Sequence, residues 1–218
     1  MRCRDIGAAL AFTASAALTG CTLVDLSQER EALAQAIPCC LSLSEVPSVS
    51  FDEVRDQIVF LDSSRPVIDL PTGKTFVLLV ELPEDRKLNR LVINSYYTDI
   101  NPYRHRVTSR ILYPTISILN SARDVVRVVP ESDFSFAREK WGEPNRLTTK
   151  IALSPDQEAE KYVAIYTTEE AVASQRRHTV QTTTGVMAGT VPIIIPIRTN
   201  RVTPGSAVGR IKLRASSE

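Results

Sequence analysis

Cys21 is the residue whose sequence context predicts its chemistry most directly. Arg2 and Arg4 precede an uncharged stretch over residues 6–18, which runs into Leu18-Thr19-Gly20-Cys21. This stretch is shorter than the roughly 20 apolar residues of a transmembrane helix, so we interpret it as the apolar part of a cleaved signal peptide. A small pair directly before a cysteine resembles the lipobox at which bacterial lipoproteins are acylated. We therefore predict a bacterial lipoprotein signal peptide over residues 1–20 and a lipid on the sulfur of Cys21.

The next residue, Thr22, indicates the membrane to which the lipid attaches. Inner-membrane retention of such lipoproteins is usually marked by an aspartate at this position, and Thr22 lacks that mark. For a Gram-negative cell we expect an exported protein in the periplasm. We expect acyl chains that include palmitate to anchor it to the inner leaflet of the outer membrane.

Two adjacent cysteines, Cys39 and Cys40, are the remaining thiols of the mature chain. They lack the spacing of a C-x-x-C metal or redox motif, and no histidine lies nearby. An oxidising periplasm permits a vicinal disulfide, although neighbouring Cα atoms are about 3.8 Å apart and a bridge usually needs ~4.4 Å or more. Three states stay open: a vicinal disulfide, two packed thiols, or an intermolecular bond or modified cysteine. None of them favours a redox function.

Residues that could carry out catalysis form no recognisable pattern. His105 and His178 are the only histidines, and no serine lies in a G-x-S-x-G motif, so a serine hydrolase is not predicted. The adjacent acids at 52–53 and 84–85 resemble hydrated surface pairs more than a glycosidase acid and base held across a cleft. A phosphate-binding glycine loop and spaced metal ligands are also missing. We predict that the protein is not an enzyme and uses no metal or cofactor.

Aromatic residues offer one binding chemistry, sugar stacking, beside a structural role that the sequence favours more. Sugar rings stack on aromatic faces, and Trp141, Tyr96 and Tyr97 fall at predicted strand ends and loops. Gly142 and Pro144 favour a loop that presents the Trp141 indole. These three residues are therefore candidate sugar-binding residues. The alternative is structural: aromatic residues nearby, at 134 and 136, alternate as core residues do, and Trp141 would then cover a sheet edge.

The composition is that of a globular exported protein without net charge. Removal of residues 1–20 leaves 24 of the 26 Lys and Arg residues and 24 of the 25 Asp and Glu residues. Nucleic-acid-binding proteins carry a concentrated positive field, and no run of basic residues supplies one here. No later apolar run approaches the ~20 residues that cross a bilayer. The predicted membrane contact is therefore the lipid anchor.

Two kinds of element are predicted to position these residues. The first is a helix over residues 28–37, with Ser27 as its N-cap and Pro38 as its end. The second is a set of short apolar runs bounded by turn-forming residues, which indicate strands. Strands are expected over residues 76–82, 88–96, 111–119, 125–129, 147–153, 162–167 and 209–214. Many short strands without long intervening helices favour a mainly β fold, an antiparallel, jelly-roll-like β-sandwich.

The last quarter of the chain departs from this pattern. Residues 167–170, Thr-Thr-Glu-Glu, fit a capping box, so one short helix is expected after the strand at 162–167, running to about Arg177. Polar and small residues over 179–189 favour a mobile loop. The prolines within 191–197 allow only an edge strand or an extended packing segment.

The predicted organisation has three parts. Residues 1–20 form the signal peptide, residues 21–50 a lipid-anchored helical tether, and residues 51–218 the β-sandwich domain. In the closing strand, Ile211 and Leu213 are expected to face the core, because side chains alternate between the two faces of a strand.

Four segments together resemble one protein family. They are Cys-Cys-Leu-Ser-Leu-Ser-Glu-Val-Pro at 39–47, Tyr-Pro-Thr-Ile-Ser-Ile-Leu at 113–119, Tyr-Val-Ala-Ile-Tyr-Thr-Thr-Glu at 162–169 and the strand with alternating basic residues at 209–214. Over roughly residues 39–214 the chain is similar to the maltose operon periplasmic protein family. The resemblance implies a periplasmic location and an association with maltose or maltodextrin uptake, and it brings no established catalytic residues.

Together these observations predict a non-catalytic periplasmic lipoprotein associated with carbohydrate transport. Its expected partners are the membrane, through the anchor, and maltodextrin or a sugar-uptake porin. The alternative is an envelope protein-interaction module that binds an outer-membrane pore or transporter through a sheet edge or a loop, without sugar contact.

Overall fold

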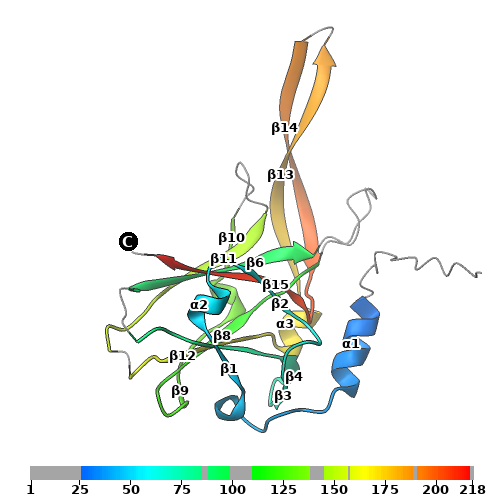
Figure 1. Ribbon diagram of the computed structural model, residues 1–218. Coiled ribbons are helices and arrows are strands. Elements are labelled where there is room, and N and C mark those ends of the chain that lie inside the picture. Colours follow the sequence, from blue (N-terminus) through cyan, green and yellow to red (C-terminus); the bar gives the residue numbers. More distant parts are fainter. Residues whose placement is uncertain are drawn as a thin grey trace, which may run out of the picture.

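The computed structural model describes residues 26–84, 88–98, 110–137, 145–156, 158–188 and 191–216, most of which lie in strands (Figure 1). Cys21, His105 and Trp141 lie outside these residues, so the predictions made for them are not addressed by the fold. Within the described residues, no helix is long and apolar enough to cross a membrane.

The first sheet has five strands in the order β1-β5-β12-β8-β9. These strands are β1 (Ser48–Ser50), β5 (Leu78–Glu81), β12 (Tyr162–Tyr166), β8 (Thr115–Leu119) and β9 (Val125–Val129). Neighbours are antiparallel except for β1 and β5, which run parallel. The prediction of a purely antiparallel architecture is therefore wrong at this edge. The chain leaves the sheet between these two strands to form β2, β3 and β4, and it returns in the same direction.

The second sheet has the order β10-β11-β6-β15-β2. Its strands are β10 (Ser135–Ala137), β11 (Arg146–Ala152), β6 (Arg90–Thr98), β15 (Gly209–Ser216) and β2 (Ile58–Leu61), and β7 (Arg110–Ile111) pairs with one end of β6. A separate small pair consists of β3 (Val67–Leu70) and β4 (Gly73–Phe76). Tyr96 and Tyr97, two of the candidate sugar-binding residues, lie near the C-terminal end of the central strand β6.

Both large sheets contribute to one hydrophobic core. The first sheet supplies buried side chains from β5, β8 and β12, and the second supplies them from β2, β6, β11 and β15. Alternate residues of a strand face opposite sides of its sheet, which explains why Ile211 and Leu213 are fully buried while Arg210 and Lys212 are not. The sequence prediction for this closing strand is confirmed.

Helices are short and lie outside the sheets. They are α1 (Leu26–Gln35), α2 (Phe51–Val54), α3 (Glu169–Ala173) and the 3-10 turns η1 (Leu43–Glu45) and η2 (Glu131–Asp133). Helix α1 confirms the helix predicted near this position, although it begins and ends two residues earlier than expected. The Lys74 ammonium group donates hydrogen bonds to the carbonyl oxygens of Ala34 at 3.0 Å and Ala36 at 3.1 Å. A cation on carbonyl groups that the helix end leaves unpaired fixes α1 against β4.

Helix α3 is shorter than predicted and has a different N-cap. The hydroxyl of Thr168 accepts a hydrogen bond from the Ala171 N–H at 3.1 Å, which makes Thr168 the cap. The Thr167 hydroxyl instead donates to the Tyr113 carbonyl oxygen at 3.0 Å. The helix ends at Ala173, so the prediction of a helix to Arg177 is wrong. The backbone of residues 175 onward pairs with another strand, and this pairing competes successfully with helix formation.

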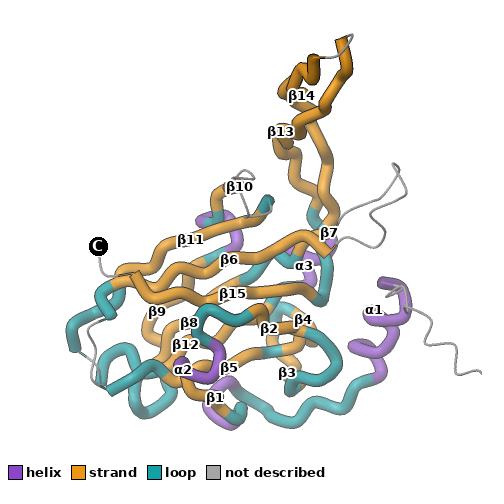
Figure 2. The backbone as a smooth tube through the Cα atoms, turned by 45° about the horizontal axis from the view of Figure 1, so that its top comes forward, coloured by secondary structure: helices purple, strands orange, loops and turns teal. Residues whose placement is uncertain are grey.

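A long hairpin replaces the loop predicted over residues 179–189. Strands β13 (Gln175–Ala188) and β14 (Val191–Pro204) pair antiparallel over their whole length, and both views show the hairpin projecting from the sheets (Figures 1 and 2). Threonine is a strand former because it is β-branched, and residues 179–184 contain four threonines. The polarity that suggested a loop was therefore misleading. Among the described strands β14 pairs with β13 alone and is an edge strand, one of the two placements that its prolines allowed.

Candidate functional site

The two candidate sugar-binding tyrosines do not share a surface. Tyr96 and Tyr97 are consecutive residues of β6, so their side chains face opposite sides of the sheet. Tyr96 is only 7% exposed. Tyr97 packs against the core, with its ring edge-on to Phe136 at 6.2 Å between ring centres. A joint platform needs two exposed ring faces on one side of the sheet, which this arrangement does not provide. The third candidate, Trp141, lies outside the described residues, between β10 and β11.

The adjacent cysteines are joined in a disulfide with 2.11 Å between the sulfur atoms. This is one of the three states that the sequence left open. Cys40 is buried and forms an isolated bridge with Ile68 of β3, whereas Cys39 is exposed and its N–H donates to the Val67 carbonyl oxygen at 2.8 Å. The pair therefore fixes the segment after α1 to the edge of β3, which is a structural role.

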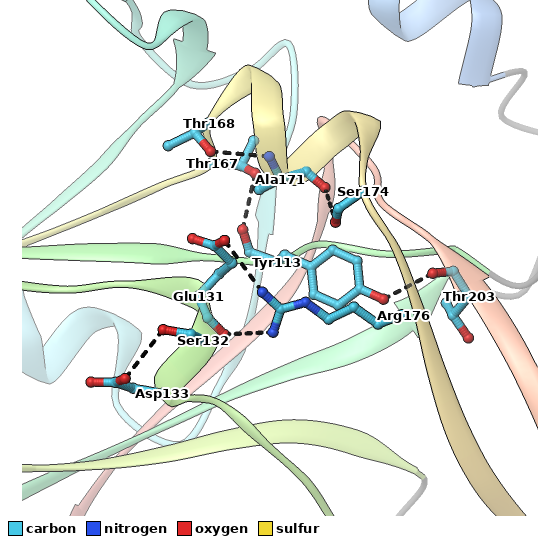
Figure 3. A network of polar contacts seen from close by, with 10 residues as sticks. All are labelled: Tyr113, Glu131, Ser132, Asp133, Thr167, Thr168, Ala171, Ser174, Arg176 and Thr203. Atoms are coloured by element: carbon cyan, nitrogen blue, oxygen red, sulfur yellow. Dashed lines mark hydrogen bonds and ion pairs between the residues drawn. The ribbon is translucent and has the colours of Figure 1, made fainter.

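A polar cluster at the base of the hairpin connects it to the sheets (Figure 3). The Arg176 guanidinium, from β13, lies over the Tyr113 ring with 4.8 Å to the ring centre. It also donates to the Glu131 carbonyl oxygen at 2.9 Å and pairs with the Glu131 carboxylate at 3.3 Å. The Tyr113 hydroxyl donates to the Thr203 carbonyl oxygen of β14 at 2.9 Å. One tyrosine thus contacts both strands of the hairpin.

Tyr113 is buried in this cluster and stays protonated at neutral pH. Its side chain is fully buried, and burial, reinforced by neighbouring Tyr97, raises the pKa of Tyr113 to about 12. A phenol that holds its proton so tightly is a hydrogen-bond donor and not a base. Together with the cation–π contact and the ion pair, this chemistry suits a mechanical anchor for the hairpin and does not suit catalysis.

A cavity of about 490 Å³ lies between α1 and α3. It is lined by Arg30, Leu33, Ala34, Lys74, Glu169, Val172, Ala173 and Ala207. The volume is that of a small-molecule site, but no aromatic ring is among the lining residues, and a pyranose would find no stacking face there. Both cations of this lining are already engaged in holding α1, because Arg30 donates to the Val172 carbonyl oxygen at 3.1 Å and Lys74 donates to carbonyl oxygens at the helix end.

The outer face of the second sheet is basic. Register and strand alternation place seven cations there: Arg90, Arg110, Arg146, Lys150, Arg210, Lys212 and Arg214. In the described strands of this sheet no acidic residue shares that face; Asp56, beside the sheet, pairs with Arg214 at 3.1 Å. Since the mature chain has no net charge, this concentration is local. It suits an anionic partner and would not distinguish neutral sugars.

The acids and histidines considered for catalysis or metal binding form no catalytic arrangement in the described residues. In that part of the chain no group of three or more His, Cys, Asp or Glu side chains could hold a metal ion. The acids Asp52 and Glu53 lie in α2, and Glu84 is exposed after β5. His178 lies in β13, in place of the helix end predicted for it.

Sequence reasoning missed the hairpin anchor. Tyr113, Glu131 and Arg176 lie in three separate stretches of the chain, and only the packing of β13 against the loop before β8 and against η2 brings them together. The one available signal was Tyr113 within an apolar run, since a buried phenol requires a hydrogen-bond acceptor.

Comparison with known proteins places this arrangement in a family. The family model described as maltose operon periplasmic protein precursor (MalM) matches residues 72–214, from β4 through β15. No curated protein and no solved structure matches the chain. The matched span contains the hairpin, its anchor and most of both sheets, while α1 and the vicinal disulfide precede it. Because the match covers well over half of the 218 residues, the chain belongs to the maltose operon periplasmic protein family.

Proposed function

We propose that this protein is a periplasmic lipoprotein that acts in maltose and maltodextrin uptake without catalysing a reaction. The observation that carries the proposal is the family match over residues 72–214, which spans the strands of both sheets from β5 onward. In this proposal the two sheets act as a jelly-roll-like sandwich, a rigid carrier for loops and for the hairpin. The non-catalytic part of the proposal is supported by Tyr113, whose pKa is raised by burial and whose hydroxyl serves to hold the hairpin.

The lipid anchor is the second part of the proposal. Lipid on Cys21 would attach the chain to the inner leaflet of the outer membrane. Helix α1 begins at Leu26 and is fixed to the body through Arg30 and Lys74. Five extended residues span at most about 17 Å. The anchored protein would therefore be held close to the membrane surface, where sugar-uptake porins open into the periplasm.

Direct binding of maltodextrin is tested by calorimetry. The full chain with Cys21→Ser, which lacks the acylation site, is titrated with maltodextrin up to millimolar concentration, and the fluorescence of Trp141 is followed in parallel. If Trp141 stacks a sugar ring, binding heat and a fluorescence shift appear together, and Trp141→Ala weakens both. Since Tyr96 is buried, Tyr96→Phe serves as the matched control and leaves affinity unchanged. No heat at millimolar ligand excludes the sugar-binding role.

A second candidate function is favoured by the hairpin. A two-stranded projection of this length presents its backbone far from the sheets, as expected of a module that binds an outer-membrane pore or transporter (Figure 2). Affinity purification from detergent-solubilised envelopes tests it. The wild-type chain should recover a porin that a variant with residues 179–200 replaced by Asn-Gly does not recover. Recovery by both variants would place the contact elsewhere, and recovery by neither would favour the sugar-binding role.

A further inference from the structure

The hairpin has two free edges with different backbone chemistry. In the described residues β13 and β14 form a sheet of only two strands, so each strand has one edge without a neighbour. The Gly205 N–H donates to the Ser174 carbonyl oxygen at 2.9 Å, which makes this residue pair a hydrogen-bonded one. Hydrogen-bonded and non-hydrogen-bonded pairs alternate in an antiparallel ladder. This one pair therefore fixes which of the later pairs in β13 and β14 are hydrogen-bonded to each other. Gln175 and Pro204 form the next pair, which is non-hydrogen-bonded. The backbone groups of such a pair point away from the partner strand, toward the two free edges, and these are called outward positions.

The edge of β14 is blocked by proline. Pro192 and Pro196 are separated from Pro204 by an even number of positions, so all three prolines occupy outward positions of β14. A proline there has no N–H to offer an incoming strand, and it leaves the bonds to β13 intact. Natural sheets use this arrangement to prevent edge-to-edge association.

The edge of β13 has no such protection. The outward positions on this strand include Arg177, Thr179, Gln181, Thr183 and Gly185, and none is a proline. Each offers both an N–H and a carbonyl group along an edge that the ladder leaves unpaired. A two-stranded hairpin is marginally stable in water without a third strand or a covering layer, and the anchor formed by Tyr113 and Arg176 lies at its base.

We propose that the open edge of β13 binds β13 of a second copy of this chain, in antiparallel orientation about a two-fold axis near Thr182. The outward positions then pair with one another, Gln181 with Thr183 of the partner and Thr179 with Gly185 of the partner. The product is a four-stranded sheet in the order β14-β13-β13-β14. This inference does not depend on maltodextrin binding or on a porin.

Charge favours the antiparallel second copy over other pairings. Arg176 and Arg177 lie at the base end of β13, whereas its distal end, Val186-Met187-Ala188, is uncharged. Antiparallel pairing about Thr182 places Arg177 opposite Met187 of the partner, so the cations of the two copies stay apart. Parallel pairing would set like charges side by side, which is unfavourable.

The blocked edge of β14 limits the assembly to two copies. After β13 pairs with its partner, both outer edges of the four-stranded sheet belong to β14, with prolines at positions 192 and 196. A further chain would find too few backbone donors to extend the sheet. The structure therefore favours a closed dimer over a filament, and an isologous two-fold contact is the commonest form of such a dimer.

Single-cysteine cross-linking in intact cells tests the axis with the full, acylated chain. In an antiparallel pair the Cα atoms of non-hydrogen-bonded residues lie about 4.5 Å apart, within reach of a disulfide. Thr182→Cys should give a disulfide-linked homodimer as the main species on non-reducing gels. Ile197→Cys is the matched control, because Ile197 is the register partner of Thr182 on the blocked strand, and it should stay monomeric. A scan over residues 180–184 locates the axis.

Proline substitution supplies an independent measurement. Gln181 and Arg198 lie opposite each other as a non-hydrogen-bonded pair, and their N–H groups point toward the free edges. A proline at either position therefore removes no hydrogen bond between β13 and β14. Gln181→Pro should abolish the cross-linked dimer formed by Thr182→Cys, and Arg198→Pro should not. Equal cross-linking from Thr182→Cys and Ile197→Cys, or equal effects of the two prolines, would overturn the proposal. Cross-linking of Thr182→Cys to a different envelope protein would likewise reject the second copy as the occupant.

Discussion

At the scale of single residues, Tyr113 determines how the hairpin is held. Its ring lies under Arg176 and its hydroxyl reaches the Thr203 carbonyl, so one buried side chain contacts both strands. Buried polar groups stabilise a fold only when they are fully paired, and this cluster meets that condition through Thr167 and Glu131 as well.

Tyr113 makes stability depend on pH in the alkaline range. The folded protein holds the phenol proton more tightly than the unfolded chain, because the pKa rises from 10.0 to about 12 on folding. The stabilisation is complete below pH 10 and is lost as the pH rises toward 12, a change of roughly 3 kcal/mol. Tyr113→Phe should cost about 1 kcal/mol at pH 8 through the lost hydrogen bond. Urea unfolding at several pH values should show the difference between wild type and variant shrinking above pH 10 and changing sign toward pH 12, because the variant has no phenol to ionise; a constant difference would contradict this account.

Acylation is also decided by one residue. Since the lipobox pattern leaves the Cys21 sulfur as the attachment point, cells grown with radiolabelled palmitate should label the wild-type chain and not Cys21→Ser. Cys39→Ser combined with Cys40→Ser is the matched control, because these sulfurs are joined to each other and the variant should keep the label. Label that survives Cys21→Ser would show that the signal has been misinterpreted.

At the scale of elements, short contacts fix segments that cannot form a core of their own. The vicinal disulfide holds the chain after α1 against β3, with Cys40 buried beside Ile68. Replacing both cysteines with serine puts a hydroxyl in an apolar site and should lower the free energy of unfolding by about 1–3 kcal/mol. The rate of maltodextrin uptake by cells should stay close to that of the wild type, although the variant is less stable. A stably folded variant without uptake activity would instead assign these cysteines a functional role.

Helix α1 should detach when Lys74 is changed. Lys74→Met removes both hydrogen bonds to the helix end, each worth about 1 kcal/mol, while it keeps the length of the side chain. Limited proteolysis should then cut within residues 26–38 faster than in the wild type, with little change in the melting of the sheets. Lys150→Met, at an exposed position on the outer face of β11, is the control and should behave as wild type. Equal cleavage of the two variants would show that α1 is held by other contacts.

At the scale of the whole molecule, the sheets and the hairpin are energetically separate. The hydrophobic core contains residues of both large sheets and of α1, α2 and α3, and none of the hairpin residues whose side chains the structure describes belongs to it. Replacing residues 179–200 with Asn-Gly closes the hairpin at the pair His178 and Arg201 and keeps the anchor. Thermal unfolding should shift by only about 2 °C, since the loss of apolar burial is small. A cooperative loss of fold would show that the hairpin is required by the core.

Local patterns of sequence determined much of this protein. The strand pattern predicted β9, β11, β12 and β15 within one or two residues. In β11 and β15 the alternation of apolar and polar side chains reports directly which face is buried, whereas β9 and β12 were found as short apolar runs between turn-forming residues. The prolines in β14 restricted it to an edge strand or an extended packing segment, and the segments at 113–119 and 162–169 already resembled the family that matches residues 72–214. Each of these signals is contained in a few neighbouring residues, so it does not depend on the rest of the fold.

Only the tertiary structure decided which distant residues meet. The polar segment 179–189 became a strand because β14 supplied hydrogen-bond partners along its whole length, and local composition contains no information about such a partner. Tyr113 and Thr203 are 90 residues apart and touch only because both sheets and the hairpin base pack together. Tyr96 and Tyr97 were separated by the alternation of β6, once burial showed which side of the sheet carries the core. Pairing and burial depend on contacts across the whole chain, and these contacts form only when it folds.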